Sequence, residues 1–79
     1  MAVQIFLSSS LRKYVPDYNP AKGVERVIRK GMTVADICRQ LAIPTELIKI
    51  VMVNGIGKSL EHPLEGNERV GLFPPVGGG

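Results

Sequence analysis

Apolar residues along this chain fall into short runs that are separated by turn-forming residues. Residues 3–7, 48–53 and 69–73 are rich in β-branched, aromatic and leucine side chains and predict three strands. A β-prone stretch at 24–29 places Val27 and Ile28 side by side, which breaks the alternation and predicts an edge strand or a bulge. Asn54-Gly55 predicts a tight turn with positive φ, followed by a short return arm at 56–60.

The clearest helix signal begins at Thr33. Its hydroxyl is placed to cap the first free amides, and Asp36 follows three residues later near the positive end of the helix dipole. The expected helix is about ten residues long and ends before Pro44, because a residue that precedes proline disfavours helical angles. Its apolar side consists of Val34, Ile37, Cys38 and Leu41.

The order of these elements predicts an α+β domain with a single mixed sheet crossed by one helix. Residues 8–22 contain prolines and turn formers and read as a long connection with a short helical turn around 11–14. We expect the first and last strands to be central neighbours in the sheet.

Length and composition describe one small globular domain. The chain has 79 residues, of which 44% are hydrophobic and 22% charged. We expect a domain over residues 1–73 and a projecting tail over 74–79. No stretch approaches membrane-spanning length and no basic region precedes the first apolar run, so we expect a cytoplasmic location and no membrane partner.

Charge and titratable residues exclude several kinds of chemistry. Ten Lys and Arg against seven Asp and Glu give a net charge of +3, but the cations are dispersed and no aromatic residue sits inside the basic cluster, so we expect no nucleic-acid partner. Cys38 is the one cysteine and reads as a small buried hydrophobe. His62 reads as a turn residue, and no metal site is expected.

The chain ends in three glycines that follow an apolar, proline-containing segment. Pro74 and Pro75 fix φ and lack amide donors, so sheet pairing is expected to stop there and the tail to project from the domain. A terminal glycine has no Cβ, and its carboxylate therefore fits a narrow enzyme tunnel. The alternative is a frayed tail without a role.

Four motifs together resemble the MoaD/ThiS sulfur-carrier family, which has the ubiquitin-like β-grasp fold. They are TVAD at 33–36, VNG at 53–55, HPL at 62–64 and LFPPVGGG at 72–79. The resemblance spans residues 3–79 and is closest to MoaD, the small subunit of molybdopterin synthase. It implies a mixed sheet of four to five strands packed on one main helix.

The resemblance also implies a carrier cycle centred on Gly79. A MoeB/ThiF-like adenylating enzyme would use ATP and magnesium to form an acyl adenylate, and a cysteine desulfurase or rhodanese would supply the sulfur of a thiocarboxylate. The MoaE-like large subunit of molybdopterin synthase would then receive it. This chain would bind no cofactor and would not be an enzyme by itself. Contact with the partners would fall to Phe73, Pro74, Pro75, Val76, Gly77 and Gly78.

Some alternatives stay open at the level of sequence. Phe73 either contacts a partner or faces the helix as a core residue. The triple-glycine ending is frequent in thiamine carriers, so the acceptor is molybdopterin, tungstopterin or thiamine thiazole. A ubiquitin-like protein modifier uses the same activation chemistry. A β-grasp RNA-binding module has only the mildly basic charge in its favour.

Overall fold

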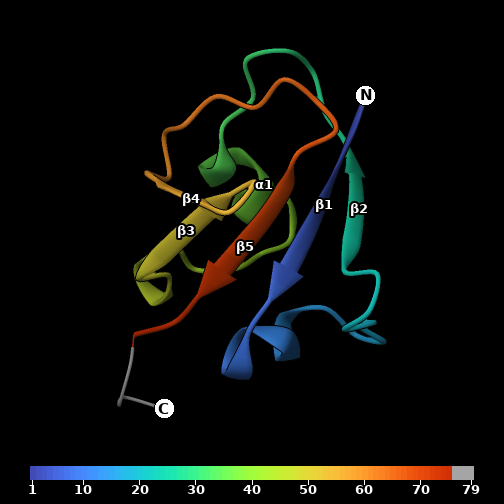
Figure 1. The fold of residues 1–79 in the computed structure, drawn as a ribbon. Coiled ribbons are helices and arrows are strands. Elements are labelled where there is room, and N and C mark those ends of the chain that lie inside the picture. The colour runs from blue at the N-terminus through green and yellow to red at the C-terminus, as the bar shows by residue number, and fades with distance from the viewer. Residues whose placement is uncertain (76–79) are drawn as a thin grey trace.

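The computed structural model describes residues 1–75, which form one sheet with one α-helix packed against it (Figure 1). The helix α1 spans Val34–Gln40, and two 3-10 turns, η1 and η2, span Ser9–Tyr14 and Thr45–Leu47. The strands are β1 Ala2–Leu7, β2 Val24–Val27, β3 Ile50–Val53, β4 Ile56–Lys58 and β5 Arg69–Phe73.

The five strands are ordered β2-β1-β5-β3-β4. β1 and β5 lie parallel at the centre, with Leu7 opposite Leu72, and each of the other neighbouring pairs is antiparallel. The predicted α+β class and the predicted pairing of the first and last strands are therefore both confirmed.

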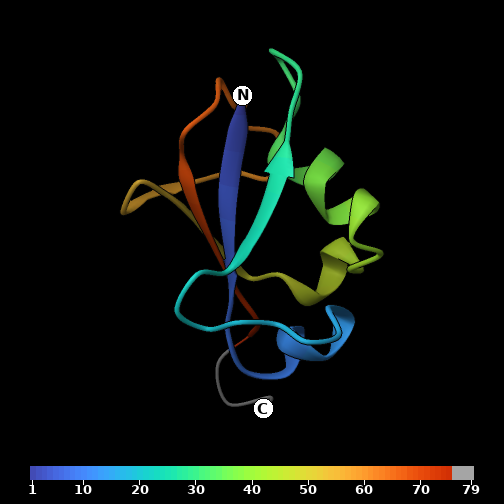
Figure 2. The ribbon, with the colours of Figure 1, turned by 90° about the vertical axis from the view of Figure 1, so that its right-hand side faces the viewer.

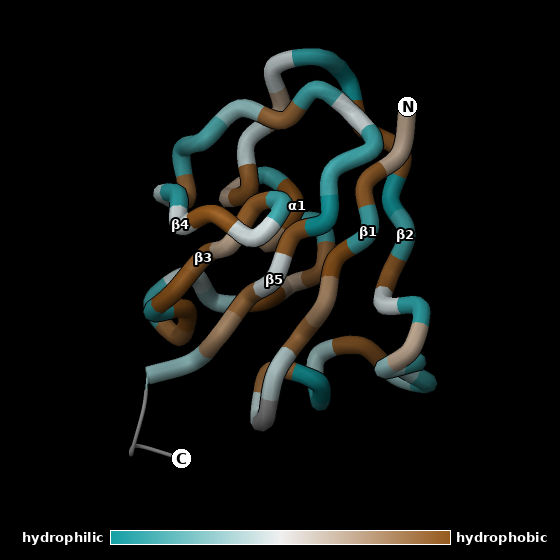
Figure 3. The backbone as a smooth tube through the Cα atoms, viewed as in Figure 1, coloured by the Kyte–Doolittle hydropathy of each residue, from teal (hydrophilic) through white to brown (hydrophobic). Residues whose placement is uncertain are grey.

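Each central strand buries alternate residues against α1, as a sheet covered on one face requires. Figure 2 shows α1 to one side of β1 and β2, and Figure 3 shows hydrophobic residues concentrated in the central strands. The fully buried side chains at the centre of this core include Val3, Ile5, Leu7, Leu11, Val34, Ile37, Cys38, Leu64, Val70 and Leu72. Cys38 is confirmed as a buried residue of the helix face.

β2 is an edge strand, which confirms one of the two predicted alternatives. Its register with β1 runs without a bulge from Val24 opposite Ile5 to Val27 opposite Ala2. The strand is shorter than the predicted 24–29, although the Ile28 N–H still donates to the Met1 carbonyl at 2.8 Å. Ile28 is buried, and the adjacent Val27 points to the opposite face.

The start of α1 is as predicted, with Thr33 as its N-cap. The Asp36 N–H donates to Thr33 Oγ1 at 3.2 Å, and the Thr33 N–H donates to Asp36 Oδ2 at 3.0 Å. These reciprocal bonds form a capping box. The backbone bond from Thr33 holds the pKa of the Asp36 carboxyl below its ordinary value.

The end of α1 differs from the prediction, because the helix has seven residues and stops before Pro44 is reached. The Ile43 N–H donates to the Cys38 carbonyl at 2.9 Å, and the Ala42 N–H donates to the Arg39 carbonyl at 3.1 Å. Ala42 has a φ of 59°, so these bonds make a Schellman motif with alanine at the left-handed position. This motif, rather than the proline, terminates the helix.

The second half of the sheet follows the predicted order. β3 begins at Ile50, two residues later than predicted, because η2 and its flanking residues occupy the chain up to Lys49. Asn54 and Gly55 have φ values of 52° and 82°, which confirms the predicted tight turn. β5 has the predicted bounds.

Candidate functional site

The predicted site begins where β5 leaves the centre of the sheet. The Lys49 N–H donates to the Phe73 carbonyl at 2.8 Å, and within residues 1–75 this is the last backbone bond from this side of the sheet to β5. Pro74 and Pro75 follow and have no N–H to donate. The predicted site residues Val76, Gly77, Gly78 and Gly79 lie outside the described residues.

Phe73 does not belong to the core beneath α1. It lies opposite Ile50 in the ladder, while its neighbour Leu72 points to the helix side and is fully buried. The Phe73 side chain is 37% exposed. Of the two alternatives left open by the sequence, the structure therefore has the outward-facing one.

Phe73 is part of an apolar surface on the uncovered face of the sheet. Ile50 is 42% exposed, Phe6 and Met52 are partly exposed, and all of them lie on the same face as Gly71 and Phe73 by the ladder register. We call these five residues the tail-side surface: Phe6, Ile50, Met52, Gly71 and Phe73. It adjoins the point at which the chain leaves the sheet.

Gly71 allows the Phe73 ring to lie against the sheet. A Cβ at position 71 would meet Cε1 of Phe73 at 3.2 Å and Cβ of Met52 at 3.8 Å. The first separation is shorter than ordinary van der Waals contact, so a larger residue would displace the ring. The missing side chain of Gly71 thereby shapes the tail-side surface.

Arg69 borders this surface with a positive charge. The guanidinium carbon of Arg69 lies 4.9 Å from the centroid of the Phe6 ring, and the backbone N–H of Arg69 donates to Asn54 Oδ1 at 2.9 Å. A guanidinium at this distance is attracted by the face of the ring. Arg69 therefore supports the orientation of Phe6 while leaving its charge at the rim.

Side chains from the long connection secure the end of β1 beside β5. The Leu7 N–H donates to Tyr18 Oη at 2.8 Å, and Arg12 Nε donates to the Leu7 carbonyl at 3.0 Å. The Arg12 guanidinium also lies over the Tyr18 ring at 5.6 Å. Reasoning from sequence missed this arrangement, because no periodic pattern relates Arg12 in η1 to Tyr18 in the irregular segment that follows it.

The described residues carry little chemistry of their own. Within residues 1–75 no three or more His, Cys, Asp and Glu side chains come together in a group able to hold a metal ion. Burial raises the pKa of the Cys38 thiol to about 11, so it stays protonated at neutral pH. His62 lies in a turn and its backbone carbonyl accepts from the Val34 N–H at 3.3 Å. The described site is a surface for contact, next to the exit of the tail.

The fold and this surface define a small β-grasp domain whose central strand leads into a glycine-rich terminus. The chain belongs to the ThiS family, whose model matches residues 13–79. The resemblance expected from the sequence is thus confirmed, and with it the ubiquitin-like β-grasp fold. Proteins of this kind are small sulfur-carrier or ubiquitin-like proteins and not enzymes by themselves, and they act together with adenylating enzymes and synthase subunits.

Three solved structures show the same fold at low sequence identity. SAMP1 from Haloferax volcanii has a TM-score of 0.73 and 20% identity, with 100% of both chains covered. The H. volcanii HVO 2177 protein has a TM-score of 0.74 and 23% identity, with 100% of this chain and 87% of the other covered. A putative molybdopterin converting factor, subunit 1, from Pyrococcus furiosus has a TM-score of 0.69 and 19% identity, with 96% and 99% covered.

No curated protein matches this chain in sequence. None of the helices within residues 1–75 has the length and apolar character needed to cross a bilayer.

Proposed function

We propose that this chain is a sulfur carrier that is adenylated and thiocarboxylated at Gly79 and donates sulfur in molybdopterin biosynthesis, as the small subunit of molybdopterin synthase. The observation that carries the proposal is the match to the ThiS family, which extends from residue 13 through the glycine-rich end at 79. The tail-side surface supports it, because it places apolar contact area next to the segment that would enter a partner.

The proposed chemistry converts a poor electrophile into a sulfur nucleophile. The Gly79 carboxylate attacks the α-phosphate of ATP, which forms the acyl adenylate and releases pyrophosphate. Sulfide sulfur then attacks the carbonyl carbon, the bond to AMP breaks, and a thiocarboxylate remains. ATP and magnesium belong to the site of the adenylating partner, which resembles MoeB or ThiF. A cysteine desulfurase or a rhodanese is the proposed sulfur source in the cell.

The residues of this chain are proposed to bind the partner and to orient the C-terminal segment toward its active site. Phe73 and its neighbours on the tail-side surface supply apolar area of the kind that anchors protein interfaces. Pro74 and Pro75 hold the backbone extended as it leaves the sheet. We propose that Val76, Gly77 and Gly78 occupy a tunnel in the partner, which is either the adenylating enzyme or a MoaE-like large subunit.

Two other outcomes share the activation step. One is sulfur donation to thiamine thiazole, which is the pathway of the protein after which the ThiS family is named. The other is attachment to a lysine of a target protein, and the likeness to H. volcanii small archaeal modifier protein 1, with a TM-score of 0.73, favours it as a second candidate. That likeness is of fold, since the identity is 19%.

The test is the intact mass of the protein, with a free C-terminus, after incubation with the activating enzyme of its host, ATP, magnesium and sulfide. The expected result is a gain equal to the exchange of one oxygen for sulfur, mapped to Gly79. A variant that lacks Gly79 should gain no mass and should unfold at the same urea concentration. An unchanged mass with an activating enzyme that modifies another carrier would overturn the proposal.

A second measurement separates the acceptors. The thiocarboxylated protein is added to a MoaE-like subunit with the pterin precursor, and in parallel to extracts of the host. Formation of the dithiolene supports the molybdopterin assignment. Isopeptide adducts of this chain in the extract, without dithiolene formation, would assign it to protein modification instead.

A further inference from the structure

The outer edge of β2 presents unpaired backbone groups to solvent. β2 is the first strand in the order of the sheet, and among residues 1–75 no strand pairs with its other side. Figure 2 shows β2 toward the viewer with no other strand in front of it. A free edge of this kind is a template for pairing with another strand.

The backbone groups that face outward belong to the odd-numbered residues. The Ile28 N–H donates inward to Met1, and in an antiparallel ladder the inward and outward residues alternate. Glu25 and Val27 therefore point their N–H and C=O groups away from β1, whereas Arg29 lies two residues beyond the end of β2 and its C=O accepts from the Met32 N–H at 3.0 Å. The Arg29 N–H meets only Met32 Sδ, at 3.3 Å, and a thioether is a weak acceptor.

One large hydrophobic side chain on this edge is exposed between charged residues. Val27 is 75% exposed, the largest exposed fraction among the large hydrophobic residues that the structure describes. By the register with β1, Glu25 and Val27 share the uncovered face of the sheet. One ion pair forms within residues 1–75, between Arg39 and Asp36, so Glu25 and Arg29 both keep an unpaired charge there.

We propose that β2 is a self-association edge, at which two copies of this chain pair antiparallel with Val27 opposite Val27. In this register the outward groups of Val27 bond to each other across the two-fold axis. The side chain of Glu25 in each copy then lies beside the side chain of Arg29 of the other copy, where that chain turns away from β2, and this juxtaposition occurs twice. The two sheets join into one of ten strands, twice the five in each copy.

The neighbouring registers are less favourable because of charge. Pairing centred on Glu25 places two carboxylates directly opposite each other, and pairing centred on Arg26 does the same for two guanidinium groups. Like charges directly opposite each other destabilise a sheet, whereas opposite charges and paired β-branched residues stabilise it. Of these registers, the one centred on Val27 pairs two β-branched residues and also brings opposite charges together.

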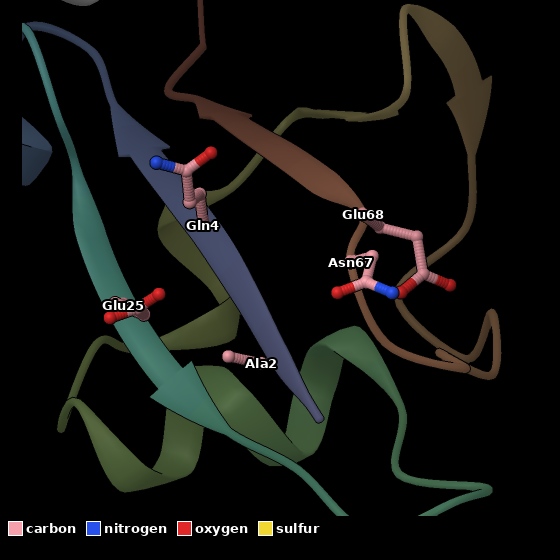
Figure 4. A pocket seen from close by; sticks show the side chains of 5 residues that line it. All are labelled: Ala2, Gln4, Glu25, Asn67 and Glu68. Carbon is pink, nitrogen blue, oxygen red and sulfur yellow. The ribbon is translucent and has the colours of Figure 1, made fainter.

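A polar hollow beside the edge provides room for the incoming arginine. It has a volume of about 170 Å³ and lies on the uncovered face, between β2 and the segment that precedes β5 (Figure 4). The Glu68 carboxylate in its wall is held by the N–H groups of Glu65 and Gly66 at 2.7 and 2.6 Å. The residues that line it are Ala2, Gln4, Glu25, Asn67 and Glu68. The carboxylates of Glu25 and Glu68 and the amide oxygens of Gln4 and Asn67 are suitable acceptors for the N–H groups of a guanidinium.

The test is sedimentation velocity of the full chain over a range of protein concentrations, with charge swaps at the edge. Glu25→Arg alone and Arg29→Glu alone each place like charges opposite in both pairs and should weaken dimerisation about tenfold. The double swap restores opposite charges and should recover most of the affinity. Glu46→Arg is the matched control for Glu25→Arg, since it makes the same change in net charge at an exposed glutamate on η2.

Hydrogen exchange at the Val27 amide supplies an independent readout, which should slow as the protein concentration rises. A chain that remains monomeric at millimolar concentration would overturn the proposal. A dimer whose affinity neither single swap changes would also overturn it. So would a double swap that weakens the dimer as much as the single swaps do. The outcome is independent of the sulfur-carrier proposal, because neither Glu25 nor Arg29 is among the residues to which that proposal gives a role.

Discussion

Replacing Ala42 by glycine should make the protein more stable. Ala42 follows the C-cap of α1 and adopts a φ of 59°, a left-handed conformation that costs an L-residue roughly 1–2 kcal/mol. Glycine adopts it freely, but it also gives the unfolded chain more freedom, which offsets about 0.4–1 kcal/mol of the gain. The Ala42 side chain is exposed, so little packing is lost with its methyl group.

The net gain from Ala42→Gly is therefore about 0.5–1 kcal/mol in the free energy of unfolding. For a domain of this size, such a gain raises the melting temperature by roughly 2–8 °C. Urea unfolding followed by circular dichroism measures it as a higher midpoint with an unchanged slope.

The matched control for this substitution is Ala21→Gly. Ala21 is also exposed, but its φ is not positive, so the added freedom of the unfolded chain should lower stability by about 0.4–1 kcal/mol. The two substitutions remove the same methyl group and should move the midpoint in opposite directions. A loss of stability in Ala42→Gly would refute the assignment of the Schellman motif.

Three further predictions concern the helix cap, the thiol and the tail-side surface. The backbone bond from Thr33 lowers the pKa of the Asp36 carboxyl in the folded protein. The contribution of the carboxylate to stability is therefore complete above its ordinary pKa of 3.8 and is lost as the pH falls through the lower folded pKa. Urea midpoints measured between pH 2 and pH 7 should show this loss in the native protein and not in Asp36→Asn. Burial raises the pKa of the Cys38 thiol to about 11, so iodoacetamide at pH 8 should label Cys38 only after urea unfolding. The free energy of unfolding should also fall as the pH rises from 9.0 toward 11. Labelling of the folded protein at the rate of a free thiol would contradict the burial. Phe73→Ala should weaken binding to the activating enzyme about tenfold or more, as measured by calorimetry, with the urea midpoint almost unchanged. Leu72→Ala, one residue away but fully buried, should instead lower the free energy of unfolding by about 2–5 kcal/mol.

The bounds of the elements were predictable wherever local chemistry decides them. Thr33 and Asp36 satisfy each other's backbone groups within one turn, and Asn54-Gly55 adopts its turn through its own backbone preferences. The end of α1 was placed too late, because the alanine at position 42 gives no sign of a left-handed residue. Only hydrogen bonds to Cys38 and Arg39 in the folded chain reveal it.

The candidate site was predictable in part, and the limit lies in the orientation of side chains. The family resemblance carried by the motifs was confirmed, and β5 ends at Phe73 directly before the two prolines. The sequence of a five-residue strand does not show which of its faces meets the helix, so the orientation of the Phe73 side chain could not be predicted. The register with β3 shows that it points outward. The hydrogen bonds of Arg12 and Tyr18 to Leu7 likewise depend on how the long connection folds back against the end of β1.

By itself the sequence determined the fold class, the order of the elements and the family, because apolar periodicity, caps, turns and motifs are properties of neighbouring residues. The tertiary structure alone decided which side chains share a face and which strands, β2 and β4, form the edges of the sheet. The tail-side surface joins residues from β1, β3 and β5, and the free edge of β2 exists because four other strands lie on its inner side. Such surfaces arise from register between distant segments, and register is settled when all segments bury their apolar faces together.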